Sequence, residues 1–108
     1  MNPWFLLSSA ILLEVIGTIC LKLSHGMTRL FPVMGVVLFY LSSFSLMAIC
    51  LKTLEVGIVY AIWAGVGTAL IAVVGILAFG ESFTWIKVLG LLLVIGGVVL
   101  LRLSIVQP

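Results

Sequence analysis

The sequence has very little charge. Of its 108 residues only 7% are charged, whereas 65% are hydrophobic, and the mean hydropathy is +1.52. A soluble domain of this length would need far more polar surface to cover its core. We therefore predict an integral membrane protein embedded in a lipid bilayer. The net charge of +2 is too small to indicate a nucleic-acid partner.

The sequence also lacks the usual motifs of catalysis and metal binding. Its two cysteines, Cys20 and Cys50, form no CxxC motif, and His25 has no Cys or His neighbour at ligand spacing. The phosphate-binding loop, the G-x-S-x-G nucleophile motif and the HExxH zinc motif are all missing. We predict no enzyme activity, no metal and no cofactor, and interpret the cysteines as buried thiols.

What the sequence does contain is four long apolar stretches. They cover about residues 3–21, 31–51, 57–79 and 85–102. Each is close to the ~20 residues that a helix needs to cross ~30 Å of hydrocarbon. Strand-like alternation is missing, which argues against a membrane β-barrel. The predicted fold is all-α, with four transmembrane helices in a single transmembrane domain. The start, "MNPWFLL", has no Lys or Arg before its apolar run, so we expect the first span to remain in the mature protein.

The basic residues near the span ends are almost evenly divided between the two sides of the membrane. One side carries Lys52 and Arg102, and the other carries Lys22, Arg29 and Lys87. Adding the N-terminal amine to the first side makes the count a tie. Either one residue decides a single orientation, or the chain inserts in both orientations. We adopt the second interpretation, which allows two copies to pair as an antiparallel dimer.

Glu14 is the only acid inside a span, in "SAILLEVIGTICLK". An ionised carboxylate at the bilayer centre costs at least ~2.5 to 3.5 kcal/mol. On a helix, its face also holds Ala10, Gly17 and Thr18, which leave space beside the carboxylate. An interhelical hydrogen bond is the purely structural alternative. However, no Lys, Arg, Asn or Gln lies within a span away from its ends to serve as its partner, so we interpret Glu14 as a site for a proton or a cationic ligand.

Proton and cation would compete for this carboxylate. Removal from water disfavours the charged form of a carboxyl group, so such a group takes up a proton readily and releases it when a cation arrives. If the site faces opposite sides of the membrane in its two states, a proton gradient can drive cation export.

Three aromatic residues could attract a cation through their rings. Tyr40 lies near the middle of the second span, and "YAIWAGVG" places Tyr60 and Trp63 on one face of the third. The alternative is the aromatic belt at the membrane surface. That alternative suits Trp4 and Trp85, which lie at span ends, and Tyr60, which lies within a turn of the membrane edge. It suits Tyr40 and Trp63 less well.

Glycines suggest a flexible segment and a helix seam. Gly65 and Gly67 lie inside the third span, where they allow either bending or close helix approach. Gly90 and Gly97 lie seven residues apart on one face of the fourth span, which is typical of a helix–helix seam and, in a terminal span, of a dimer contact.

Taken together, these residues resemble the small multidrug resistance family of proton-coupled exporters. The resemblance covers nearly the whole chain and rests on "AILLEVIGT", "LKLSHGMTRLFP", "GIVYAIWAGVG" and "GLLLVIGGVVLL". It implies a multi-pass protein of the bacterial inner (plasma) membrane, working as an antiparallel, dual-topology homodimer. In such a dimer both Glu14 side chains would bind protons and substrate in alternation.

The resemblance also implies roles for the other residues. Tyr40, Tyr60 and Trp63 would line the pocket, and Ala10, Gly17 and Thr18 would shape it. The third helix would flex at Gly65 and Gly67, and the fourth would form the dimer seam at Gly90 and Gly97.

Gly17 together with Tyr40 is similar to the quaternary-ammonium, multidrug branch of the family. The guanidinium-exporting branch carries a Trp at the place of Gly17 and no Tyr at that of Tyr40. The departures from the multidrug pattern are His25, Phe31, Ser45 and Glu55. Of these, Ser45 is the one expected to alter which drugs are accepted.

The predicted function is proton-coupled export of lipophilic and quaternary ammonium cations. Two alternatives stay open. One is export of a small metabolite cation such as guanidinium, choline, betaine or a polyamine. The other is a non-transporting partner subunit of a hetero-dimer.

Overall fold

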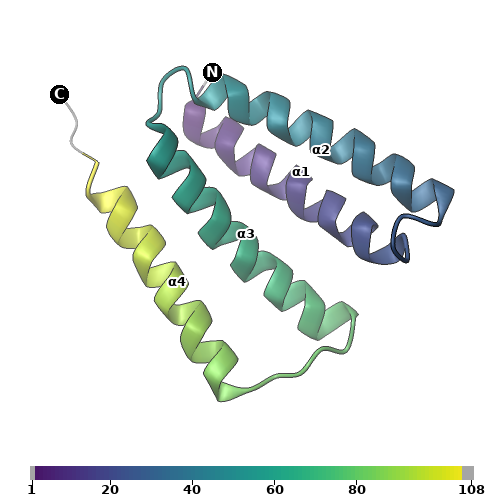
Figure 1. Ribbon diagram of the computed structural model, residues 1–108. Helices are drawn as coiled ribbons and strands as arrows, with labels where there is room; N and C mark the ends of the chain where they lie inside the picture. The colour runs from purple at the N-terminus through teal and green to yellow at the C-terminus, as the bar shows by residue number, and fades with distance from the viewer. Residues whose placement is uncertain (1, 106–108) are drawn as a thin grey trace. The chain divides into compact units, whose positions relative to one another are not determined.

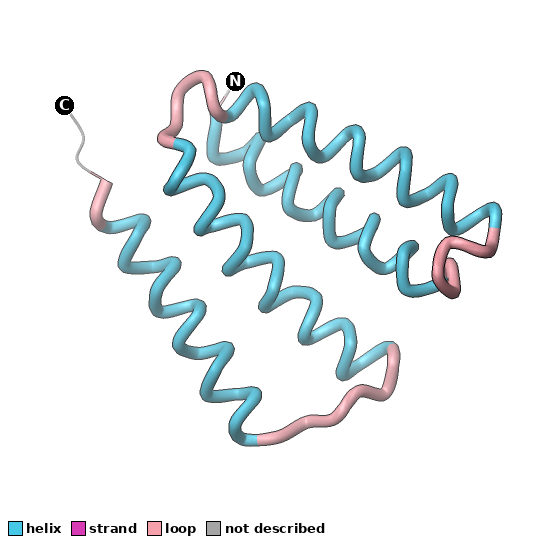
Figure 2. Tube along the Cα trace, viewed as in Figure 1, coloured by secondary structure: helices cyan, strands magenta, loops and turns pink. Residues whose placement is uncertain are grey.

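The computed structural model describes residues 2–105, which form four helices and no strand (Figures 1 and 2). The helices are α1 (Pro3–Leu23), α2 (Leu30–Cys50), α3 (Val56–Ala78) and α4 (Trp85–Leu103). All four are long and apolar enough to cross a membrane. The predicted class, an all-α membrane protein with four transmembrane helices, is confirmed.

Two of the helices, α1 and α4, begin where the sequence supplies a side-chain cap. The Asn2 side chain accepts a hydrogen bond of 2.9 Å from the Trp4 backbone N–H, and Pro3 occupies the first turn of α1. At the start of α4, the Thr84 hydroxyl accepts from the Lys87 backbone N–H at 3.1 Å. These caps satisfy backbone donors that the first helical turn leaves without partners.

The chain forms two compact units, one ending at Glu55 and the other beginning at Val56. Each unit is a helical hairpin, α1 with α2 and α3 with α4 (Figure 1). That the whole chain forms one transmembrane domain stays a prediction.

In the first hairpin, α1 and α2 run antiparallel. Near the turn, the Cys20 side chain lies against Gly35, and at the far end the Cys50 Sγ donates to the Pro3 carbonyl over 3.5 Å. Both cysteines are free thiols. The buried residues of α2 recur every seven residues, which is the spacing of a continuous helix–helix seam. They are Val36, Ser43 and Cys50, and they pack with the buried residues of α1, which are Leu6, Leu7, Ala10, Ile11, Val15 and Gly17.

The turn between α1 and α2 is short and internally hydrogen-bonded. The backbone φ angles of the turn are positive at His25, Gly26 and Met27, with values of 49°, 73° and 67°. Residues other than glycine rarely adopt this conformation. Ser24 is fully buried, and its hydroxyl accepts from the Met27 backbone N–H at 3.0 Å. The Thr28 backbone N–H closes the turn on the Ser24 carbonyl at 2.9 Å. This turn holds the two helices together at one end of the hairpin.

In the second hairpin, α3 and α4 approach closely at Gly65. A Cβ atom at this position would collide with the Val98 side chain and would contact that of Val94 at 3.4 Å. In the link between the helices, Gly80 has a φ of 65°, which lets the Glu81 backbone N–H turn back to the Gly75 carbonyl at 3.1 Å.

No residue of α4 is buried by the other residues of the described range, 2–105. Its exposed side chains include Ile86, Leu93 and Leu100, with 85%, 70% and 69% of their surfaces open. A surface of this kind is unfavourable in water and is typical of a segment covered by lipid or by another protein chain.

Candidate functional site

The candidate site is centred on Glu14, which is half-buried in the middle of α1. One turn further along the helix, the Thr18 hydroxyl donates a hydrogen bond of 3.1 Å to the Glu14 Oε1 atom. The i, i+4 spacing of a helix brings these two side chains together.

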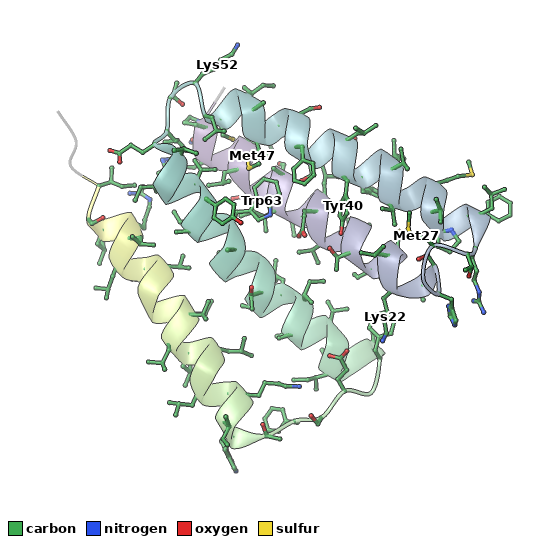
Figure 3. All side chains as sticks on the ribbon, in the orientation of Figure 1. Lys22, Met27, Tyr40, Met47, Lys52 and Trp63 are labelled. Carbon is green, nitrogen blue, oxygen red and sulfur yellow. The ribbon has the colours of Figure 1, made fainter. Side chains whose placement is uncertain are left out.

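The hydrogen-bonded chain continues to the facing helix. The Thr18 Oγ1 and Tyr40 Oη atoms are 2.8 Å apart, and Tyr40 projects from α2 on the side of α1 (Figure 3). A hydroxyl group has one proton to donate. When Thr18 donates to the carboxylate, Tyr40 must therefore donate to Thr18. No residue from Leu30 to Cys50 is charged, so the carboxylate faces hydroxyl and ring groups on this helix rather than an opposite charge.

Gly17 makes this contact sterically feasible. A Cβ atom at position 17 would lie 2.6 Å from both the Cδ1 and Cε1 atoms of the Tyr40 ring, and 3.3 Å from the Phe39 Cβ. Those ring distances are shorter than any normal carbon–carbon contact. The Tyr40 ring thus occupies the space of a missing side chain, and its hydroxyl reaches Thr18 as a result.

Three further residues of the first hairpin, Ala10, Phe44 and Ser45, lie near the hydrogen-bonded chain in the sequence of α1 and α2. Ala10, one turn before Glu14, is fully buried and contributes to helix packing. The rings of Tyr40 and Phe44 lie 5.9 Å apart at an angle of 42°, a separation typical of interacting aromatic pairs. The Ser45 hydroxyl donates to the Leu41 carbonyl of its own helix at 2.7 Å.

The structure therefore brings Glu14, Gly17, Thr18 and Tyr40 together in one hairpin. Tyr60 and Trp63 lie on α3, in the other hairpin. Tyr60 is 71% exposed and Trp63 is half-buried. Their place in a shared pocket stays a prediction.

The four glycines of interest differ in their surroundings. Gly65 and Gly67 are both buried in α3, which continues as a helix through them. The close approach of Val98 gives Gly65 a packing role, and its flexibility stays a prediction. Cβ atoms at Gly90 and Gly97 would meet nothing within 4 Å. These two glycines therefore lie on an open face of α4, and their assignment to a dimer seam also stays a prediction.

Ser43 is a residue that the sequence analysis did not single out. It is fully buried, and among the described residues its Oγ is the one buried side-chain oxygen or nitrogen without a hydrogen-bond partner. A buried polar group in this state carries a free-energy cost. The seven-residue spacing of Val36, Ser43 and Cys50 could have indicated that this serine faces α1. Within residues 2–105, no group of three or more His, Cys, Asp or Glu side chains could hold a metal ion.

Comparison with known proteins agrees with this architecture. A family model described as "Small Multidrug Resistance protein" matches residues 2–94. The chain belongs to the small multidrug resistance family. It is accordingly a multi-pass plasma-membrane protein, as its four apolar helices also indicate.

Three relatives illustrate the range of the family. Multidrug resistance protein EbrB of Bacillus subtilis (strain 168) is 49% identical over 98 residues, covering 91% of this chain and 84% of the relative. Multidrug transporter EmrE of Escherichia coli (strain K12) is 43% identical over 103 residues, covering 95% and 94%. The guanidinium exporter of Salmonella typhimurium (strain LT2) is 41% identical over 101 residues, covering 94% and 96%.

Proposed function

We propose that this chain is a proton-coupled antiporter that exports lipophilic cations, in particular quaternary ammonium compounds. The observation that carries the proposal is the Glu14 carboxylate, which accepts a hydrogen bond from the Thr18 hydroxyl and faces no cationic side chain on α2. A positive charge supplied from outside the protein would balance it. EbrB and EmrE, by name multidrug proteins, support this substrate class.

Exchange follows from competition at one carboxylate. A proton neutralises Glu14, and a cation binds it only after that proton has left. Transport requires that the site open to opposite sides of the membrane in its proton-bound and cation-bound states. The proton gradient then drives export of the cation.

The working unit in this proposal is an antiparallel homodimer of two oppositely inserted copies. The near-even count of basic residues on the two sides supports dual insertion. The open face of α4 at Gly90 and Gly97 provides a surface for the second copy, because small residues let helices approach closely in a membrane. Tyr60 and Trp63 would add aromatic faces for the cation.

Export of a small cation such as guanidinium is the second candidate, supported by the similarity to a guanidinium exporter. The Gly17–Tyr40 contact favours the first candidate. The large side chain that the guanidinium-exporting branch carries at this position would collide with the Tyr40 ring. In this chain the same space holds an aromatic ring with a hydroxyl group.

The proposal is tested by transport into liposomes that contain the whole protein and carry an imposed pH gradient. Wild-type protein should move a quaternary ammonium cation against the proton flow, and its apparent affinity for the cation should rise with pH as protons leave the site. Glu14→Gln should abolish coupled transport and the pH dependence, because a glutamine neither ionises nor binds a proton at neutral pH.

The matched control is Glu55→Gln, which removes an exposed acid outside the helices and should leave transport unchanged. Proton-driven transport that survives in Glu14→Gln would refute the proposal. Transport of guanidinium but of no quaternary ammonium cation would favour the second candidate.

A further inference from the structure

The geometry points to Thr18, supported by Tyr40, as the positioning residue that adapts the Glu14 carboxylate to cations without N–H groups. The inference rests on the proposed function, since it concerns the substrate class of the same site. Thr18 lies on the same helix as Glu14, and Tyr40 on the facing helix of the same hairpin.

The need for an internal donor follows from the chemistry of a quaternary ammonium ion. An ionised carboxylate has two oxygens that together accept about four hydrogen bonds. A quaternary ammonium ion carries a positive charge and no N–H, so it balances the charge and leaves these acceptors empty. In a site without water, an acceptor without a donor is unfavourable. The protein itself must then supply the hydrogen bond.

Thr18 supplies this hydrogen bond. Its hydroxyl donates to Glu14 Oε1 at 3.1 Å. The Tyr40 hydroxyl, 2.8 Å from Thr18 Oγ1, in turn donates a hydrogen bond to the Thr18 oxygen. Successive hydroxyl groups polarise one another, which strengthens the terminal bond to the carboxylate. The contact of the Tyr40 ring with Gly17 fixes this geometry.

A guanidinium-type cation has the opposite requirement. Its planar N–H groups match a carboxylate and donate two parallel hydrogen bonds to it. The cation and the Thr18 hydroxyl can then occupy different acceptor positions of the carboxylate, so the bound cation does not depend on the hydroxyl. Loss of the Thr18 hydroxyl should therefore weaken the binding of cations without N–H far more than the binding of cations with N–H.

The same hydroxyl pair also serves the protonated carboxyl group. A protonated Glu14 can donate to Thr18, and Thr18 can then donate to the Tyr40 oxygen, so that the chain of hydrogen bonds runs in reverse. Binding should therefore be measured at alkaline pH, where competition by protons is smallest and only the ionised form is compared.

The test uses two probes with the same phenyl ring and the same charge. Phenyltrimethylammonium has no N–H, whereas phenylguanidinium has several. Their dissociation constants are measured by calorimetry on the whole protein in detergent micelles, for wild type and for Thr18→Val, which keeps the side-chain shape and removes the hydroxyl. Binding of phenyltrimethylammonium should weaken about tenfold, as expected for the loss of one hydrogen bond to a charged group. Binding of phenylguanidinium should stay near the wild-type value, because its own N–H groups supply hydrogen bonds to the carboxylate.

Two further variants separate this effect from a change in packing. Thr18→Ser keeps the hydroxyl and should preserve the wild-type ratio of the two dissociation constants. Tyr40→Phe keeps the ring, removes the supporting donor, and should shift the ratio in the same direction as Thr18→Val by a smaller factor.

Equal weakening of both probes in Thr18→Val, or a Thr18→Ser ratio equal to that of Thr18→Val, would overturn the inference. If Thr18→Val binds neither probe, Tyr40→Phe decides, and an unchanged ratio there overturns it. The proposed function fails separately, if Glu14→Gln binds both probes as tightly as wild type.

Discussion

Replacing Gly17 with alanine adds one methyl group at the point where α1 meets the Tyr40 ring. The added carbon would lie 2.6 Å from two ring atoms, whereas carbon atoms pack best at about 3.5–4.0 Å. The ring must therefore move by roughly 1 Å. A shift of this size away from α1 takes the Tyr40 hydroxyl, now 2.8 Å from Thr18 Oγ1, out of hydrogen-bond range.

Two opposing effects set the change in stability. Overpacking costs about 1–3 kcal/mol, while alanine favours a helix over glycine by about 1 kcal/mol. The free energy of unfolding should therefore fall by no more than about 2 kcal/mol. Binding of phenyltrimethylammonium should weaken, because the displaced ring leaves Thr18 without its supporting donor.

The assay combines thermal unfolding in detergent with calorimetric binding of this cation. Gly57→Ala is the matched control, since a Cβ atom there meets nothing within 4 Å, and it should leave both quantities near wild type. In a Tyr40→Ala background the ring is gone, so adding Gly17→Ala should have little further effect. This coupling between the two positions is what a double-mutant cycle measures.

Additive effects of the two substitutions would contradict a direct contact between Gly17 and the Tyr40 ring. If Gly17→Ala weakens binding equally with and without the Tyr40 ring, the contact with Tyr40 is not what makes glycine necessary. Unchanged binding in Gly17→Ala alone would contradict the proposed geometry as well.

Two further predictions concern the packing of the second hairpin and the insertion of the chain. Gly65→Ala should lower the free energy of unfolding by up to about 2 kcal/mol, because its methyl group collides with Val98 while alanine gains about 1 kcal/mol of helix propensity over glycine. Val98→Ala should rescue the loss, and an unfolding midpoint equal to that of Gly65→Ala would count against this contact. Reporters fused to the C-terminus should give signals from both sides of the membrane. A signal from one side alone would contradict dual insertion and favour a hetero-pair.

The four helices could be predicted from the sequence because the bilayer sets both their length and their composition. The predicted spans and the observed helices differ by at most two residues at any end. Each apolar run is bounded by polar or glycine residues, as at Asn2 and Thr84, whose side chains cap helices. Hydropathy carries this information without any knowledge of how helices pack.

The site could be predicted only as far as one helix extends. The spacing of Glu14 and Thr18 places them on one face, and their hydrogen bond follows from it. The contact of Gly17 with Tyr40 depends on the axial position of α1 relative to α2. The packing of all the side chains between the two helices determines that position. The sequence indicated both residues and gave no distance between them.

The surroundings of Ser43 and Gly65 also could not be predicted from the sequence, because they depend on the packing of neighbouring helices. A serine in an apolar span can bond to its own helix, as Ser42 and Ser45 do with the carbonyls of Leu38 and Leu41. The sequence does not distinguish Ser43 from these neighbours, although it is buried without a partner. From the sequence, Gly65 allows either helix bending or close helix packing. In the structure the Val98 side chain lies against Gly65, which shows close packing.

The two thiols of the first hairpin have a practical consequence for counting chains. Cys20 lies beside Gly35 and Cys50 beside Pro3, so they are separated along α1 by roughly 25 Å at 1.5 Å per residue. A disulfide requires Cα atoms within about 7 Å of each other. One copy cannot bridge its own two cysteines without unfolding the hairpin. Any disulfide between cysteines of the folded protein must therefore join two chains, and it would appear on a non-reducing gel as a band at twice the monomer mass.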